Sequence, residues 1–174
     1  GQGEATPAFA WYSQMYNGFV HTIDTVKLHL SNCEKLVAKR VGGQYVTYHL
    51  GVASDVIPTI EGEIDLLYID SSDDPQVALE EFNAAKGKFT PQTILFIDDM
   101  HEVLGKFEGK GELVHKMLIS SGDWKVAYYW LGGGQLIMVR ADIELKESLK
   151  KAMVEGRMSP CCCPECLARR AKRV

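Results

Sequence analysis

Hydrophobic residues along the chain gather in short runs that have the β-branched and aromatic content of buried parallel strands. Four such runs are predicted to be strands: residues 19–23, 45–50, 64–69 and 93–97. Three stretches of helical length lie between them: residues 26–40, 54–60 and 75–86. This alternation predicts a Rossmann-like α/β fold, in which a mostly parallel sheet with right-handed crossovers carries helices on both faces.

The pattern changes near the C-terminal end, where two apolar runs are joined by three glycines. Trp124–Leu131 and Gln135–Arg140 flank Gly132–Gly134, a combination typical of a β-hairpin. We therefore expect the sheet to end in an antiparallel strand pair. With 174 residues the chain has room for one compact domain, predicted over residues 1–156, followed by a Cys-rich basic tail over residues 157–174.

Aspartates follow three of the predicted strands directly. Asp24 comes after the first, Asp70 after the third, and Asp98 and Asp99 after the fourth. Ligands of open parallel sheets bind beyond the carboxyl ends of the strands, so these side chains are candidates for the site. A functional role competes here with simple capping of a turn or of the following helix.

The first residues add a second indication of a nucleoside pocket. Gly1 and Gly3 form a glycine turn that leads into a helix, whose free N–H groups and dipole favour a ligand at its start. Asp24 follows at the end of the next strand, where a carboxylate accepts both hydrogen bonds of a ribose diol. A dinucleotide site would need a third glycine where this chain has Thr6, which disfavours a nicotinamide-dependent oxidoreductase.

Composition narrows the class of partner. The net charge of −4 creates no field for a polyanion, which makes nucleic acid an unlikely partner and a small-molecule acceptor the better expectation. No run approaches the roughly 18 apolar residues of a membrane span, so we expect no membrane partner. The clustered cysteines of the tail do not form a spread disulfide framework, and a cytoplasmic protein is expected.

These residues resemble a known family. The runs 20–24, 51–58, 64–70 and 94–99 are similar to class I S-adenosylmethionine-dependent methyltransferases, and within them to small-molecule O-methyltransferases of the catechol, caffeoyl-CoA and macrolide-sugar type. The resemblance covers residues 1 to about 140 and implies S-adenosylmethionine as the cofactor. It implies that Gly1, Gly3 and Thr6 border the methionine side, that Asp24 holds the ribose, that Asp70 borders the cofactor, and that Ala53 and Ser54 border the adenine.

The metal-dependent branch of that family implies a divalent ion. Asp70, Asp98 and Asp99 occupy the positions of its ligands, and three hard oxygen ligands suit Mg²⁺. Asp70 would then act in catalysis, and His101 is the available general base. Catechol enzymes have a lysine shortly after the Asp that follows the fourth strand of their sheet, whereas this chain has Asp73 and Asp74, which argues against a catechol substrate.

The beginning of the chain leaves an alternative open. A glycine turn needs a strand before it, and that strand is absent from the sequence, so the methyltransferase domain is expected to be N-terminally incomplete. The alternative function is therefore a cofactor-binding protein of the same fold without turnover. A missing strand also makes a homodimer an expected form of the protein.

Overall fold

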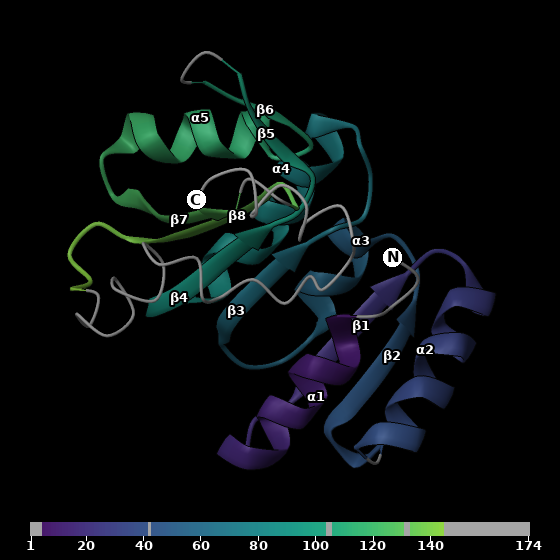
Figure 1. Cartoon of the computed structure of the whole chain (residues 1–174). Helices are drawn as coiled ribbons and strands as arrows, with labels where there is room; N and C mark the ends of the chain where they lie inside the picture. The colour runs from purple at the N-terminus through teal and green to yellow at the C-terminus, as the bar shows by residue number, and fades with distance from the viewer. Residues whose placement is uncertain (1–4, 42, 104–105, 131–132, 145–174) are drawn as a thin grey trace, which may run out of the picture. The chain divides into compact units, whose positions relative to one another are not determined.

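The structure is a computed structural model that describes residues 5–41, 43–103, 106–130 and 133–144 (Figure 1). The chain divides into two compact units, residues 1–61 and residues 62–174, and each is considered by itself. The predicted single domain over residues 1–156 stays a prediction, and the Cys-rich tail lies outside the described residues.

The first unit is built around two parallel strands. β1 and β2 pair in register from Val20 opposite Val46 to Asp24 opposite Leu50. The elements of this unit are α1 (Ala5–Tyr16), β1 (Val20–Asp24), α2 (Lys27–Arg40), η1 (Gly43–Tyr45), β2 (Val46–Leu50), α3 (Ala53–Val56) and η2 (Ile57–Thr59).

The core of the first unit joins both long helices to one face of this strand pair. Ala10 of α1, Cys33 and Val37 of α2, and Val46 of β2 form a buried cluster. Side chains two apart on a strand share a face, so Val20 and Thr22 of β1 lie on the face that Val46 occupies. This packing holds the carboxyl end of β1, and thus Asp24, at a defined edge of the unit.

The second unit holds a four-stranded sheet in the order β3-β4-β8-β7. β3 and β4 are parallel, while β8 runs antiparallel to both β4 and β7. A separate hairpin, β5-β6, follows β4. The elements are β3 (Ile64–Ile69), α4 (Pro75–Ala85), η3 (Lys86–Lys88), β4 (Phe89–Ile97), β5 (Met100–Val103), β6 (Lys106–Gly109), α5 (Glu112–Ser121), β7 (Trp124–Trp130) and β8 (Gln135–Arg140).

Helices α4 and α5 cover one face of this sheet (Figure 1). Phe82 of α4 and Leu118 of α5 are buried against Ile69, Leu95 and Leu136 of the strands. α4 begins as its sequence predicts: Asp74 is the N-cap and accepts a hydrogen bond from the backbone N–H of Gln76 at 2.9 Å, while Pro75 occupies the first turn. The cap and the buried face together fix the loop that follows β3.

The predicted fold class is confirmed, with parallel strand pairs, helices and the antiparallel C-terminal hairpin. Two features differ from the prediction. β4 begins at Phe89 instead of residue 93, because Pro91 and Gln92 interrupt the apolar pattern although Phe89 still pairs with Ile64. The β5-β6 hairpin was not predicted, since its strands are only four residues long and mostly exposed. No helix among the described residues is long and apolar enough to cross a membrane.

Candidate functional site

Three predicted site residues of the second unit lie at one edge of its sheet. Asp70 follows β3, and Asp98 and Asp99 follow β4, its parallel neighbour. The backbone N–H of Asp98 donates to the carbonyl of Ile69 at 3.1 Å, which extends the pairing of the two strands to their ends. Adjacent parallel strands therefore bring the three carboxylates together, as the sequence predicted.

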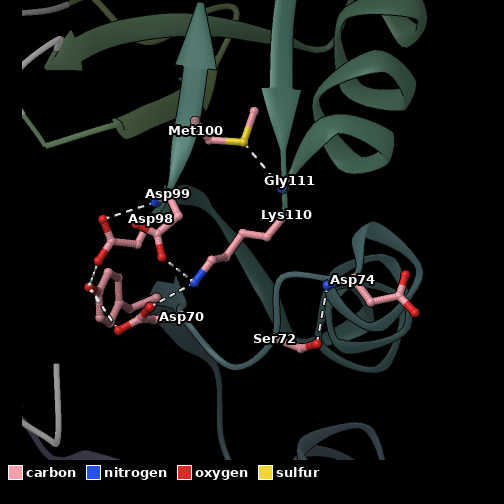
Figure 2. A network of polar contacts seen from close by, with 9 residues as sticks. Asp70, Ser72, Asp74, Asp98, Asp99, Met100, Lys110 and Gly111 are labelled. Atoms are coloured by element: carbon pink, nitrogen blue, oxygen red, sulfur yellow. Dashed lines mark hydrogen bonds and ion pairs between the residues drawn. The ribbon is translucent and has the colours of Figure 1, made fainter.

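A lysine that the sequence analysis missed lies among them (Figure 2). The ammonium Nζ of Lys110 is 2.8 Å from Oδ1 of Asp70 and 3.0 Å from Oδ2 of Asp99. The Lys110 side chain is only 3% exposed. Burial alone would lower the pKa of Lys110, but the hydrogen bonds and charges of Asp70 and Asp99 raise it above its ordinary value, so the group carries a positive charge.

Asp98 is held by a different partner. The hydroxyl of Tyr68 donates to Oδ2 of Asp98 at 2.7 Å and lies 3.4 Å from Oδ2 of Asp70. Burial raises the pKa of Tyr68, and the hydrogen bond to Asp98 and the charge of Asp70 raise it further, so the hydroxyl stays protonated and donates. Tyr68 stands two residues before Asp70, and the period of two along a strand could have indicated it.

The backbone around Lys110 explains why a lysine reaches this place. Gly109 has a φ of +110°, and a Cβ added there would lie 2.3 Å from the carbonyl oxygen of Asp99. The N–H of Gly111 contacts the sulfur of the buried Met100 at 3.2 Å (Figure 2). The end of β6 thus lies directly against residues 99 and 100, and the only sequence signal for this contact is a lysine between two glycines.

The arrangement does not fit a divalent metal ion. The described part of the chain contains no group of three His, Cys, Asp or Glu side chains that could hold one. An ammonium lies between Asp70 and Asp99, while Asp98 contacts the Tyr68 hydroxyl. Mg²⁺ would need oxygen ligands at about 2.0–2.1 Å on several sides. The predicted magnesium site is therefore not supported.

Asp99 itself adopts an uncommon backbone conformation, with a φ of +50°. Aspartate tolerates this left-handed region better than most residues. The turn places the Asp99 carboxylate, which is 57% exposed, against Lys110 while Met100 enters the core. Position 99 is thus a strand-to-strand turn whose side chain still faces solvent.

Glu81 adds a buried carboxyl near this network. It lies in α4 with 5% of its surface exposed. Burial raises the pKa of Glu81, and a hydrogen bond from Ser71 and the charge of Lys110 partly offset the rise. Lys110 therefore has carboxyl groups near it from three earlier parts of the chain: the end of β3, α4 and the end of β4.

We expect Glu81 to make the protein less stable as the pH rises. The folded state holds the proton of Glu81 more tightly than the unfolded state, so the free energy of unfolding falls from about pH 4.5 upward until the folded-state pKa is passed. Glu81→Gln should flatten this slope, so that its free energy of unfolding rises relative to that of the wild type as the pH rises. Urea unfolding across a pH series measures the difference, and Glu80→Gln, an exposed neighbour, should leave the slope unchanged. Parallel pH profiles of wild type and Glu81→Gln would contradict the assignment.

His101, the predicted general base, lies on β5 two residues beyond Asp99 and is exposed. Its backbone lies opposite Glu108 of β6. No polar partner of its side chain is shown among the described residues, so its ring is accessible to a ligand. Its catalytic role stays a prediction.

Asp24 in the first unit lies where the sequence predicted, at the end of β1. Its Oδ1 accepts a hydrogen bond from the N–H of Val26 at 2.8 Å, and its Oδ2 is 3.2 Å from Nδ1 of His29. The side chain remains 33% exposed. A carboxylate has about four lone-pair directions, so two internal contacts leave acceptor capacity for a ligand. Turn capping and ligand binding are thus compatible at this residue.

Other predicted cofactor residues surround the same strand end. Thr22 of β1 donates its hydroxyl hydrogen to the hydroxyl of Thr6, at the start of α1, over 3.3 Å. The N–H of Gly51 donates to the carbonyl of Asp24 at 3.1 Å. Ala53 and Ser54 begin α3 shortly after. Gly1 and Gly3 lie outside the described residues.

The fold and the carboxylates at the strand ends together indicate the class of protein. A Rossmann-like α/β chain with a carboxylate at the carboxyl end of each of the parallel strands β1, β3 and β4 has the features of a nucleotide-type cofactor binder. A methyltransferase domain family matches residues 5–100, more than half of the chain and across both units. The chain belongs to this methyltransferase domain family, and its predicted assignment as an S-adenosylmethionine-dependent methyltransferase is confirmed.

Solved structures share the fold at low sequence identity. An rRNA methylase from Streptococcus thermophilus has a TM-score of 0.61 and 14% identity, with 80% of this chain and 81% of that chain covered. The O-methyltransferase TomG from Streptomyces achromogenes, in complex with S-adenosylmethionine, has a TM-score of 0.55 and 19% identity over 76% of this chain and 70% of that chain. An O-methyltransferase from Bacillus cereus has a TM-score of 0.54 and 12% identity, with 79% of this chain and 81% of that chain covered. No curated protein matches.

Proposed function

We propose that this methyltransferase transfers a methyl group from S-adenosylmethionine to an oxygen atom of a small molecule. The observation that carries the proposal is the placement of Asp24 at the last residue of β1, and of Asp70 and Asp98 directly after β3 and β4, in a chain of the methyltransferase domain family. Asp24 is proposed to hold the ribose of the cofactor, with Thr6, Ala53 and Ser54 near it. Gly1 and Gly3 are proposed to border the methionine end.

Charge supports a cationic cofactor at the second unit. Asp70, Asp98 and Asp99 set three carboxylates against the single ammonium of Lys110. The excess of negative charge favours a sulfonium and disfavours phosphate groups. The same argument, together with the net charge of −4, favours a small acceptor over a nucleic acid. The rRNA methylase shows that the fold also occurs in enzymes so named, but at 14% identity it supports the fold alone.

The chemistry needs a base and an ordered acceptor. Bound S-adenosylmethionine supplies an electrophilic methyl group on a cationic sulfur. The acceptor oxygen bonds to that carbon while the carbon–sulfur bond breaks and its electron pair stays on sulfur, so the acceptor hydroxyl must lose its proton. His101 is the proposed base, since it lies exposed on β5, two residues beyond Asp99 in the chain. Lys110 is charged and paired, and is therefore not a base.

The proposal is tested by binding and transfer together. Calorimetry should show that S-adenosylhomocysteine binds and that NAD does not. Label from S-adenosylmethionine should then pass to hydroxylated small molecules and not to ribosomal RNA fragments. His101→Gln should lower kcat by about 100-fold and spare S-adenosylhomocysteine binding, because a general base acts only on the transfer step.

Glu108→Gln is the matched control for His101→Gln, since Glu108 lies opposite on β6 and is exposed. It should leave kcat nearly unchanged. Binding of NAD alone would contradict the methyltransferase function. Transfer to RNA alone would contradict the small acceptor, and an unaltered kcat in His101→Gln would remove this residue as the base.

A further inference from the structure

The contact of Lys110 with two carboxylates carries an inference that does not depend on the identity of the acceptor. Asp70 ends β3, Asp99 follows β4, and Lys110 lies between β6 and α5, so three separate elements converge on one ammonium (Figure 2). Its nitrogen is within 3.0 Å of an oxygen of each carboxylate. We propose that Lys110 is a built-in cation that fills the position between Asp70 and Asp99 and keeps divalent metal ions from binding there.

Lys110 excludes a divalent ion from the position between Asp70 and Asp99 both by the space it fills and by its charge. A divalent ion on Asp70 and Asp99 would occupy the place of the ammonium, because both cations need the same two oxygens. If the ion displaced it from these oxygens, the Lys110 side chain, which is 3% exposed, would carry a buried charge without its partners, which is a costly state. Asp98 does not replace this pair of carboxylates: its oxygens accept hydrogen bonds from the Tyr68 hydroxyl at 2.7 Å and the Asp99 N–H at 3.1 Å, and the lone pairs that remain belong to one carboxylate, whereas a divalent ion needs several oxygen ligands.

The lysine is held by its backbone as well as by its charge. The end of β6 touches the carbonyl of Asp99 so closely that a Cβ at Gly109 would clash, and the N–H of Gly111 is against the Met100 sulfur. A lysine on an exposed helix surface could swing away and admit a metal ion, but Lys110 enters the site from a fixed strand end. The geometry therefore assigns the ammonium a permanent place in the site.

Mn²⁺ alone is the probe for the test, because it binds the oxygen ligands that suit Mg²⁺ and its binding is read by electron paramagnetic resonance. The folded wild-type protein should show no saturable Mn²⁺ binding at this site. Lys110→Met keeps the length of the apolar stem and removes the charge, and should bind Mn²⁺ at least about tenfold more tightly than the wild type does. Adding Asp99→Asn to Lys110→Met should abolish the new binding.

Two controls separate this effect from a general loss of positive charge. Lys116→Met removes an exposed lysine of α5 that is paired with Glu112, and should bind no Mn²⁺. Lys110→Arg keeps a cation in the site and should also bind none. Saturable Mn²⁺ binding to the wild type that Asp99→Asn abolishes would overturn the proposal. Failure of a folded Lys110→Met variant to bind Mn²⁺ would overturn it equally.

The removal of Lys110 could also prevent folding, because three carboxylates would then face one another. Refolding of Lys110→Met is therefore compared with and without Mn²⁺. Recovery of native circular dichroism with Mn²⁺, but not in the Lys110→Met/Asp99→Asn variant, supports the proposal; no recovery with Mn²⁺ overturns it. Where the proposed methyl transfer is also measured, chelators should leave the wild-type rate unchanged, a result that rests on the proposed function while the Mn²⁺ measurements do not.

Discussion

Asp24→Ala should lower the affinity for S-adenosylhomocysteine by roughly 100- to 1000-fold, with the fold retained. The proposed role of Asp24 is to accept both hydrogen bonds of the ribose diol, and hydrogen bonds to a charged group contribute about 1.5–3 kcal/mol each. Two such bonds sum to about 3–6 kcal/mol, and a loss at the lower end, about 3–4 kcal/mol, corresponds to that range of affinity. Asp24→Asn keeps one acceptor oxygen and should lose less. Calorimetry with S-adenosylhomocysteine measures all three proteins.

The two internal contacts of Asp24 require their own control. Its Oδ2 is 3.2 Å from His29, and its Oδ1 accepts from the Val26 N–H, so the alanine variant also disturbs a turn. His29→Gln disturbs the neighbouring contact without touching the carboxylate and should change the affinity by no more than about threefold, a fraction of one hydrogen bond. If His29→Gln were as damaging as Asp24→Ala, the turn would be the cause and not the ribose. An unchanged affinity of a folded Asp24→Ala protein for S-adenosylhomocysteine would contradict the assignment of Asp24 to the ribose.

Gly109→Ala should be the most damaging of the small substitutions near the carboxylates. A Cβ at this position would lie 2.3 Å from the Asp99 carbonyl oxygen, a backbone atom that cannot move aside freely, and the φ of +110° is unfavourable for alanine. Strain and clash together should reduce the free energy of unfolding by about 3 kcal/mol or more. For a chain of this length the melting temperature should fall by roughly 6–12 °C, since each kcal/mol corresponds to about 2–4 °C.

Gly122→Ala is the matched control for this effect. Gly122 also has a positive φ, +74°, at the end of α5, but nothing lies within 4 Å of an added Cβ. Only the conformational penalty of roughly 1–2 kcal/mol applies there. Thermal unfolding followed by circular dichroism compares the two variants. Equal losses would show that β6 does not lie against Asp99 as closely as the structure has it, and the fixed position of Lys110 would lose its support.

Lys110 has the role at its carboxylates that a metal ion has at a metal-binding carboxylate site. Carboxylates that meet at a sheet edge repel one another, and a cation of some kind must offset that repulsion. A metal ion does so with strict ligand geometry, whereas a lysine does so with a single ammonium that needs no fixed number of ligands. In this chain Asp70 and Asp99 are offset by Lys110, and Asp98 is stabilised by the neutral Tyr68 hydroxyl.

The periodicity of the sequence determined most of the fold by itself. β3 begins and ends at the predicted residues, α2 and α4 begin within a residue of theirs, and the glycine-joined hairpin forms as expected. These features depend on local information: apolar runs, a capping Asp74 and Pro75 at a helix start, and turn residues. The strand-end positions of Asp24, Asp70, Asp98 and Asp99 are equally local, because each ends or follows its strand in the chain.

Only the tertiary structure decided which side chains are the partners of the carboxylates Asp70, Asp98 and Asp99. Lys110 is 40 positions from Asp70 in the chain, and it reaches the site through the short β5-β6 hairpin, whose exposed strands carry little periodic signal. Tyr68 meets Asp98 across neighbouring strands through a register that the sequence does not state. A pattern of residues therefore predicts that carboxylates gather at a sheet edge, but the cation that balances them is chosen by long-range packing, here by the close approach of Gly109 to Asp99.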